Sequence, residues 1–144
     1  MKQSFETNID FFFEQCRKNN LKITPQRVSI YKIIARSEQH PTAEIIYNTV
    51  KKEFPNISLD TVHRTLMTFN EIGLLNVVEG YGSPRRFDPN TQIHHHLICE
   101  QCGKIIDFTN KNFDNLQIPE ELLKDFSINR KRVILSGICG KCQK

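Results

Sequence analysis

Two pairs of cysteines with the same short spacing constrain this chain more than any other feature. Cys99 and Cys102 form a C-x2-C pair in the sequence ICEQCGK, and Cys139 and Cys142 form a second pair in ICGKCQK. Two such pairs supply the four thiolates of a closed tetrahedral structural zinc site, so we predict that they bind one Zn2+. The alternatives are two disulfides or ordinary buried thiols. Two cysteines with two residues between them in a tight turn direct their sulfurs into one small volume, which favours metal binding.

The start of the chain indicates the redox compartment. The segment MKQSFETNIDFFFEQC is charged and has too short an apolar run for a secretory signal, so we expect a cytoplasmic protein. In a reducing cytoplasm, cysteine pairs favour metal over disulfides.

Cys16 has no partner at metal-binding spacing, and we expect it in a hydrophobic core. No apolar run in the sequence is long enough for a membrane span.

A run of three histidines before the first cysteine pair indicates a second metal site. In an extended strand, His94 and His96 would share one face while His95 points to the other. Asp88 lies upstream, and Asp107 lies on a segment expected to return antiparallel through the cysteine turn. Imidazoles with carboxylates suit a first-row ion such as Fe(II), Mn(II) or Zn(II). The alternative is a solvated histidine run with incidental acids. We expect His95, on the other face, to tolerate substitution.

The first half of the chain has the pattern of four helices. Apolar residues recur at helical spacing over residues 5–19 and in the three segments that follow. The residues expected to cap or end these helices are Asn20, Thr24, Thr42, Ser58 and Gly73. We expect Ile45, Ile46 and Val50 to form the buried face of the third helix.

The fourth helix and the segment after it suggest a DNA-binding domain. Two short strands, in LLNVVEG and SPRRFD, are joined by the turn Gly80–Gly82 and would complete a winged helix-turn-helix. The side chains placed to reach DNA bases or phosphates are Ser58, Asp60, Thr61, His63, Arg64, Arg85 and Arg86. The net charge of +4 is compatible with nucleic acid but does not establish it. A helical bundle whose polar face contacts only water remains the alternative.

The remainder of the chain predicts a small α/β unit closed by zinc. Short β-type runs surround one helix-like stretch, PEELLKDF, and one face of the sheet is expected to carry Ile105, Ile106, Phe108, Val133 and Leu135. An edge strand of such a sheet commonly pairs with a second subunit. We therefore predict a two-domain α/β fold, with a winged-helix DNA-binding domain over residues 1–87 and a dimerisation and metal-sensing domain over residues 88–144.

Other functional classes fit the sequence less well. A zinc hydrolase or deaminase would need an open zinc with a neighbouring glutamate, as in H-x-E, and the chain has none at such spacing. We therefore do not expect an enzyme. A zinc-stabilised protein-interaction module remains possible, and the salt dependence of DNA binding would distinguish the two.

Three sequence motifs together resemble the ferric uptake regulator (Fur) family of bacterial metal-responsive repressors over essentially the whole chain. These motifs are SLDTVHRTLMTFNEIGLL, HHHLICEQCGKIIDF and the terminal CGKC. The resemblance implies a homodimer with structural zinc on the four paired cysteines, and a palindromic double-stranded operator with half-sites roughly 34 to 36 Å apart. Family members usually carry tyrosine where this chain has His63, which implies an altered operator preference.

Within the family, the ligand types resemble the peroxide-responsive (PerR-like) branch. That resemblance implies a regulatory Fe2+ or Mn2+ bound by His40, Asp88, His94, His96 and Asp107. It also implies a repressor that senses peroxide through Fe(II)-catalysed oxidation of His40 and His94 and then leaves its operator. The alternative is an iron- or zinc-responsive uptake repressor. Iron-uptake members usually have glutamate at the positions of Asp88 and Asp107. They also tend to carry a further metal site, and the position of one of its histidine ligands is occupied by Lys131 in this chain.

Overall fold

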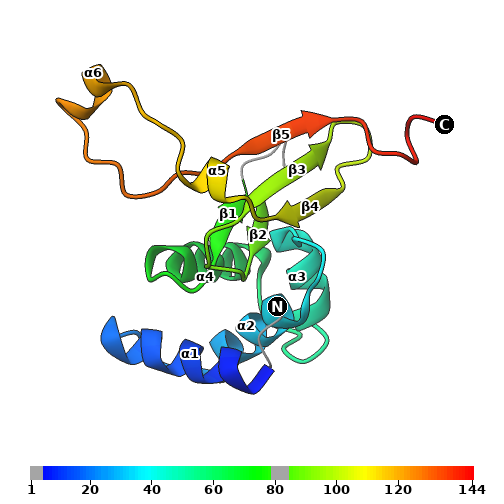
Figure 1. Cartoon of the computed structure of the whole chain (residues 1–144). Coiled ribbons are helices and arrows are strands. Elements are labelled where there is room, and N and C mark those ends of the chain that lie inside the picture. Colours follow the sequence, from blue (N-terminus) through cyan, green and yellow to red (C-terminus); the bar gives the residue numbers. More distant parts are fainter. Residues whose placement is uncertain (1–4, 79–84) are drawn as a thin grey trace. The chain divides into compact units, whose positions relative to one another are not determined.

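Four helices form the N-terminal part of the molecule, and their starts are determined by short polar residues. The computed structural model describes residues 5–78 and 85–144. The helices are α1 (Phe5–Lys18), α2 (Pro25–Arg36), α3 (Ala43–Val50) and α4 (Leu59–Glu71), as Figure 1 shows. Thr24, Thr42 and Ser58 each accept a first-turn backbone hydrogen bond at 3.0 to 3.2 Å, so all three predicted caps are confirmed. No helix in the described ranges is long and apolar enough to cross a membrane.

Two helices end at residues with left-handed backbone geometry. Asn20 has a φ of 54° and Gly73 a φ of 81°, a region that asparagine and glycine enter most readily. Beyond Gly73, the N–H of Leu74 donates to the carbonyl of Phe69 at 2.9 Å, which satisfies a carbonyl at the helix end. Both predicted helix ends are therefore confirmed.

An aromatic cluster forms the centre of the helical core. The ring of Phe12 stacks on Tyr31 with centroids 4.8 Å apart and meets Phe69 edge to face at 5.7 Å. Cys16 is fully buried in the same core, as predicted. Ile45 corrects one expectation: it is 53% exposed, whereas Ile46 is buried. Adjacent helical residues lie about 100° apart, so a short helix that buries Ile46 turns Ile45 away from the core.

A two-stranded antiparallel sheet completes the N-terminal unit. Strand β1 (Asn76–Val78) pairs with β2 (Arg86–Asp88), and Phe87 lies opposite Val77 and is fully buried. The predicted turn Gly80–Gly82 lies outside the described residues. The domain boundary expected between residues 87 and 88 falls inside β2, and the N-terminal unit extends to Thr91.

The C-terminal unit, Gln92–Lys144, is built on a three-stranded sheet with the order β4-β3-β5. Strand β3 (His95–Cys99) pairs antiparallel with β4 (Ile105–Phe108), which confirms the predicted hairpin through the cysteine turn. It pairs parallel with β5 (Ile134–Gly137). A parallel neighbour requires a long connection, and this one contains the short helices α5 (Lys111–Asp114) and α6 (Glu120–Leu123) (Figure 1).

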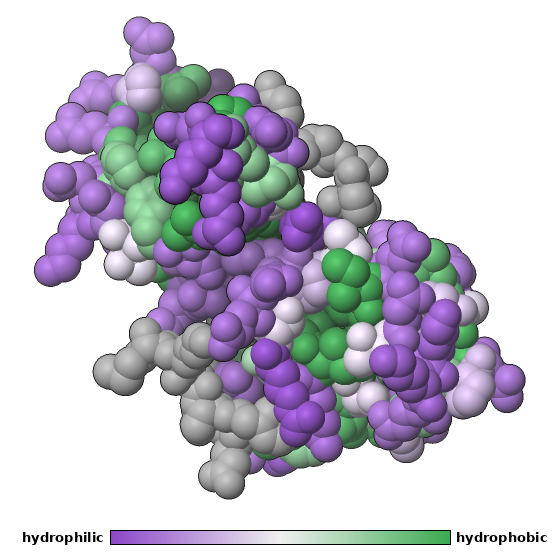
Figure 2. All heavy atoms as spheres, turned by 90° about the vertical axis from the view of Figure 1, so that its right-hand side faces the viewer, coloured by the Kyte–Doolittle hydropathy of each residue, from purple (hydrophilic) through white to green (hydrophobic). Residues whose placement is uncertain are grey.

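The sheet and the connection expose more apolar surface than the sequence suggested. Ile105 and Ile106 are consecutive strand residues, so they face opposite sides and cannot share the single apolar face that we expected. Leu97 instead lies in register with Ile106 and Leu135, and these side chains are 40, 43 and 43% exposed. The predicted helix in PEELLKDF is only four residues long and buries none of them. Figure 2 shows apolar side chains reaching the surface in patches among hydrophilic ones.

Candidate metal centres

The four paired cysteines gather at one end of the C-terminal sheet. Their sulfurs all lie within 4.8 Å of one another, and Cys102 Sγ is 3.8 Å from Cys139 Sγ. Four sulfurs about 2.3 Å from a central zinc would be about 3.8 Å apart along each edge of the tetrahedron. None of the cysteines is in a disulfide. The donor set and its spacing therefore fit a structural Zn2+.

Strand pairing explains why two cysteine pairs distant in sequence meet. Cys99 ends β3 directly beside Gly137, the last residue of the parallel strand β5. After Cys99 the chain reverses through Gly103, which has a φ of 77° and donates its N–H to the Cys99 carbonyl at 2.9 Å. After β5, the N–H of Cys142 donates to the Cys139 carbonyl at 3.0 Å. Each pair thus occupies one tight turn, and the sheet places the two turns side by side.

Backbone N–H groups favour negative charge in this cluster. Cys99 Sγ accepts hydrogen bonds from the N–H of Cys102 at 3.5 Å and of Cys139 at 3.3 Å, and these lower the pKa of Cys99 to about 6. Hydrogen bonding to the Cys139 side chain raises the pKa of Cys142 to about 12. Without a cation, the four neighbouring sulfurs cannot all ionise. Zinc binding would deprotonate the remaining thiols, so it would release protons.

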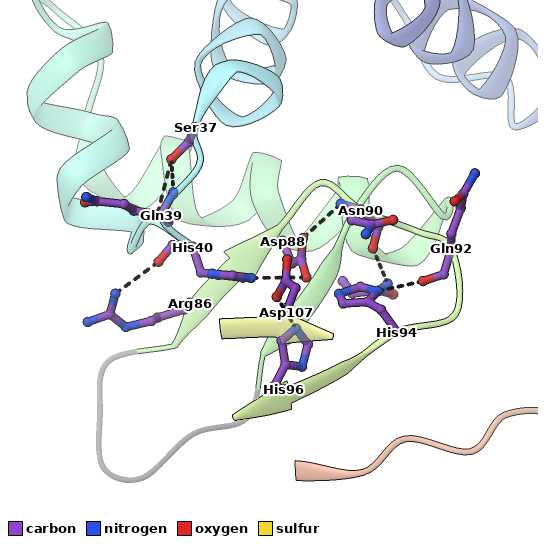
Figure 3. Close-up of polar contacts among 11 residues, drawn as sticks. Ser37, Gln39, His40, Arg86, Asp88, Asn90, Gln92, His94, His96 and Asp107 are labelled. Atoms are coloured by element: carbon purple, nitrogen blue, oxygen red, sulfur yellow. Dashed lines mark hydrogen bonds and ion pairs between the residues drawn. The ribbon is translucent and has the colours of Figure 1, made fainter. Parts of the chain in front are cut away.

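A buried histidine and aspartate lie together in the N-terminal unit. His40 Nε2 is 3.4 Å from Asp88 Oδ2, and the two side chains are only 6% and 3% exposed (Figure 3). The other carboxylate oxygen of Asp88 accepts a hydrogen bond from the N–H of Asn90 at 2.9 Å. A buried imidazole and a buried carboxylate that face each other supply two of the donor groups that a first-row metal ion binds.

The C-terminal unit holds a second histidine and aspartate pair. His96 and Asp107 are directly opposite in the β3–β4 pairing, and His96 Nε2 is 3.2 Å from Asp107 Oδ1. The His94 ring lies 4.7 Å from the His96 ring. His94 Nδ1 contacts the Gln92 carbonyl at 2.6 Å, which places the proton on Nδ1, so Nε2 is the nitrogen that could bind a metal (Figure 3). Nitrogen and oxygen donors without sulfur fit Fe(II) or Mn(II).

His95 points away from these ligands, as the strand alternation predicted, but its environment is not permissive. Its side chain is fully buried. Its Nδ1 accepts from the N–H of Val133 at 3.0 Å, so Nε2 carries the proton and donates to Asp114 Oδ1 at 2.7 Å. The burial of His95 and its two hydrogen bonds argue against the expectation that it tolerates substitution, because a strand pattern reveals the side of a residue but not its partners. Nothing in the sequence singled out Asp114.

The predicted DNA-contacting residues of α4 are mostly exposed in its first turns. Arg64 Nε is 3.1 Å from Asp60 Oδ2, with both side chains more than two-thirds exposed. His63 is exposed as well, and Thr61 is half-buried. Ser58 acts as the helix cap, since its hydroxyl accepts from the N–H of Thr61 and donates to the Thr61 hydroxyl at 2.9 Å.

The two neighbouring arginines of the predicted wing have different environments. Arg85 is exposed, and its Nη1 lies 3.7 Å from the sulfur of Met67 on α4. Arg86 is half-buried, and its Nη1 donates to the carbonyl of His40 at 3.2 Å. Arg86 and His40 are 46 positions apart in sequence, so no local pattern could have identified this hydrogen bond.

Comparison with known proteins gives consistent results for sequence and structure. The Ferric uptake regulator family matches residues 18–136. The peroxide-responsive repressor PerR of Staphylococcus saprophyticus is 37% identical over 141 residues, covering 98% of this chain and 95% of that protein. PerR of Staphylococcus aureus is 36% identical over the same shares.

Solved structures extend these similarities to the fold. The ferric uptake regulator Fur of Helicobacter pylori, which has three functional metal binding sites, matches with a TM-score of 0.79 and 27% identity, covering 99% of this chain and 96% of that one. PerR of Streptococcus pyogenes matches with a TM-score of 0.53 and 29% identity, covering 92% and 90%. The similarities confirm the predicted fold class, a DNA-binding domain followed by a small α/β dimerisation domain.

Proposed function

Because the chain belongs to the ferric uptake regulator family, we propose that it is a metal-dependent transcriptional repressor that releases its operator in response to peroxide. Family members are regulators and not enzymes. The observation that carries the proposal is the two histidine–aspartate contacts, buried His40 with buried Asp88 and buried His96 with the more exposed Asp107. Their short carboxylates and the absence of sulfur suit an ion that reacts with peroxide. The relatives named peroxide-responsive repressor support the same reading.

The regulatory ion that we propose is Fe2+ or Mn2+. Its ligands would be His40, Asp88, His94, His96 and Asp107. The first two belong to the N-terminal unit and the other three to the C-terminal unit. One ion held by both sets would favour a single arrangement of the units, and thereby one spacing of the DNA-binding helices. This is allostery through the differential affinity of a metal for two conformations.

Peroxide would act on the imidazoles of His40 and His94. Bound Fe(II) would activate peroxide, whereas Mn(II) would support DNA binding without that reaction. At each histidine, a C–H bond of the ring would be replaced by a C–O bond while peroxide is reduced to water. A 2-oxo-histidine is a poor nitrogen ligand. Loss of the ligand would therefore weaken metal binding and release the operator.

The C-terminal unit supports a proposed homodimer. Among the described residues, eleven of the fourteen exposed large apolar side chains lie between residues 92 and 144. A second copy would cover this surface, and zinc on the four cysteines would stabilise the unit that presents it. Two-fold symmetry would then match a palindromic operator read by α4, with Asp60, Thr61, His63, Arg64 and Arg85 as contacts. A reducing cytoplasm would keep the four thiols available for zinc.

Mass spectrometry after mild peroxide treatment tests the peroxide response. Fe(II)-loaded protein should gain single oxygen atoms on the peptides containing His40 and His94 and should lose DNA binding. Mn(II)-loaded protein should do neither. His63 is exposed and is not a proposed ligand, so its peptide serves as an internal control for indiscriminate oxidation.

One competing function has an observation in its favour. The structural match to the Helicobacter pylori ferric uptake regulator has a TM-score of 0.79, which is the basis for an iron- or zinc-responsive uptake repressor as the second candidate. In that case, DNA binding would follow the free metal concentration and the histidines would stay unmodified after peroxide.

A further inference from the structure

Arg86 lies in a different environment from its exposed neighbour Arg85. Its guanidinium is half-buried and donates from Nη1 to the main-chain carbonyl of His40 at 3.2 Å (Figure 3). Hydrogen bonds from a charged donor are stronger than neutral ones, and a partly buried carbonyl is costly to leave without a partner. The contact therefore restrains the backbone at a proposed metal ligand.

Main-chain contacts with β2 hold the same segment. The N–H of Phe87 donates to the carbonyl of Pro41 at 2.9 Å, and Thr42 forms an antiparallel bridge with Arg86. The segment from His40 to Thr42 is thus joined to β2 by one main-chain hydrogen bond and one isolated bridge. His40 precedes α3 and its cap Thr42, so β2, and not a helix, holds its backbone in place.

The alternation of β2 places its two polar side chains around His40. Arg86 and Asp88 are two residues apart and lie on the same side of the strand, while Phe87 between them is buried in the core. Arg86 contacts the main chain of His40, and Asp88 Oδ2 lies 3.4 Å from its ring. Strand β2 therefore supplies the proposed ligand Asp88 and holds the proposed ligand His40 in place.

We propose that Arg86 is a positioning residue of the regulatory metal site and does not contact DNA. This inference rests on the proposed function, because it assigns His40 and Asp88 to the regulatory ion. Through β2, the same residue links the ion to the strand pair β1–β2 that forms the base of the wing. Loss of such a supporting contact typically lowers metal affinity 10- to 100-fold. Arg85 is the arginine of this pair that meets DNA.

The test compares Arg86→Gln with the matched control Arg85→Gln in the full-length, zinc-loaded protein. The affinity for Mn(II) is measured from the electron paramagnetic resonance signal of free Mn(II), which needs no DNA. Operator binding is then measured over a range of salt concentrations at limiting and at saturating Mn(II). Amide hydrogen exchange at Phe87 in metal-free protein reports whether β2 still holds the segment at Pro41.

Arg86→Gln should weaken Mn(II) binding 10- to 100-fold and speed exchange at Phe87. Its operator affinity and salt dependence at saturating Mn(II) should equal those of the wild type. Arg85→Gln should keep wild-type Mn(II) affinity and reduce the salt slope by about 1. Arg86→Lys keeps the charge but not the planar donor, so its Mn(II) affinity should lie between those of wild type and Arg86→Gln.

Three results would overturn the inference. Mn(II) affinity of Arg86→Gln within twofold of wild type would remove the positioning role. A reduced salt slope for Arg86→Gln at saturating Mn(II) would make Arg86 a phosphate contact instead. Wild-type Mn(II) affinity in His40→Ala would refute the proposed regulatory site itself, and the inference would fall with it. The His40 variant therefore separates failure of the proposed function from failure of the role of Arg86.

Discussion

His95 Nε2 donates to Asp114 Oδ1 at 2.7 Å while its Nδ1 accepts from the N–H of Val133 at 3.0 Å. One buried imidazole thus connects β3 with α5 and with the residue that precedes β5. Replacing it by phenylalanine would leave the part-buried N–H of Val133 without this acceptor. We expect His95→Phe to lower the free energy of unfolding by about 1 to 3 kcal/mol, measured by urea unfolding of the zinc-loaded protein. Asp114→Asn keeps an acceptor and should cost less. Wild-type stability of His95→Phe would show that the network contributes nothing.

Zinc removal should affect the C-terminal unit selectively. Cys139→Ser removes one of four sulfurs, and structural zinc contributes on the order of 10 kcal/mol of apparent binding energy coupled to folding. We expect loss of bound zinc and of amide protection in β3 and β5, with the helices α1 to α4 still protected. Cys16→Ala is the control, since Cys16 lies in the helical core and should leave zinc content unchanged. Full zinc occupancy in Cys139→Ser would contradict the four-cysteine site.

Alkaline pH should destabilise the helical core through Tyr31. Burial, reinforced by the charge of Cys16, raises the pKa of Tyr31 from 10.0 to about 12. The neutral phenol is favoured in the folded state. The contribution of the Tyr31 phenol to the free energy of unfolding is therefore complete below pH 10. It is lost as the pH rises from about 10 to about 12, which lowers the free energy of unfolding by about 3 kcal/mol. Tyr31→Phe should lack this decline when unfolding is followed by circular dichroism between pH 8 and pH 12. Parallel curves for the two proteins would refute the assignment.

Arg64 should contribute to DNA affinity without affecting metal binding. Its exposed guanidinium, 3.1 Å from Asp60, lies in the first turns of α4. We expect Arg64→Gln to weaken operator binding by about 1 to 3 kcal/mol if it reads a base, as measured by fluorescence anisotropy. Lys104, exposed in the C-terminal unit, provides the control for a general loss of positive charge. Equal losses in Lys104→Gln would exclude a specific role for Arg64.

The length of the carboxylate at residue 107 should control the peroxide response. Asp107 Oδ1 lies 3.2 Å from His96 Nε2 across the strand pair, so glutamate would shift the carboxylate by about 1.5 Å. We expect Asp107→Glu to retain metal-dependent DNA binding but to show much less oxygen addition at His40 and His94 after peroxide. Undiminished oxidation in the variant would show that the short carboxylate is unimportant.

Local rules predicted the ends of the N-terminal helices and the tight turns of the two cysteine pairs. Thr24, Thr42 and Ser58 cap helices, and Asn20 and Gly73 end them, because these preferences depend on a few neighbouring residues. The cysteine spacing is equally local, since each C-x2-C pair forms its own turn. Such features are encoded within a window of a few residues and can be read without the tertiary structure.

Long-range contacts account for what the sequence did not reveal. Arg86 was predicted to contact DNA because it is a basic residue on a predicted wing, and nothing in the sequence indicated its hydrogen bond to His40, which lies 46 residues earlier. His95 looked dispensable because its partner Asp114 lies 19 residues later. Ile45 has the right polarity for the core but lies on the wrong side of α3. In each case the deciding information is tertiary packing, which overrides local pattern.

The long connection between β3 and β5 separates the two cysteine pairs in time during synthesis. Cys102 and Cys139 are 37 residues apart in the chain. At 5 to 20 residues per second, a ribosome needs roughly 2 to 7 s to pass from one cysteine pair to the other. During that interval the newly made pair from β3 has no counterpart with which to enclose a cation. During that period Cys99 and Cys102 would depend on a reducing environment to remain available for zinc, and faster translation would shorten it.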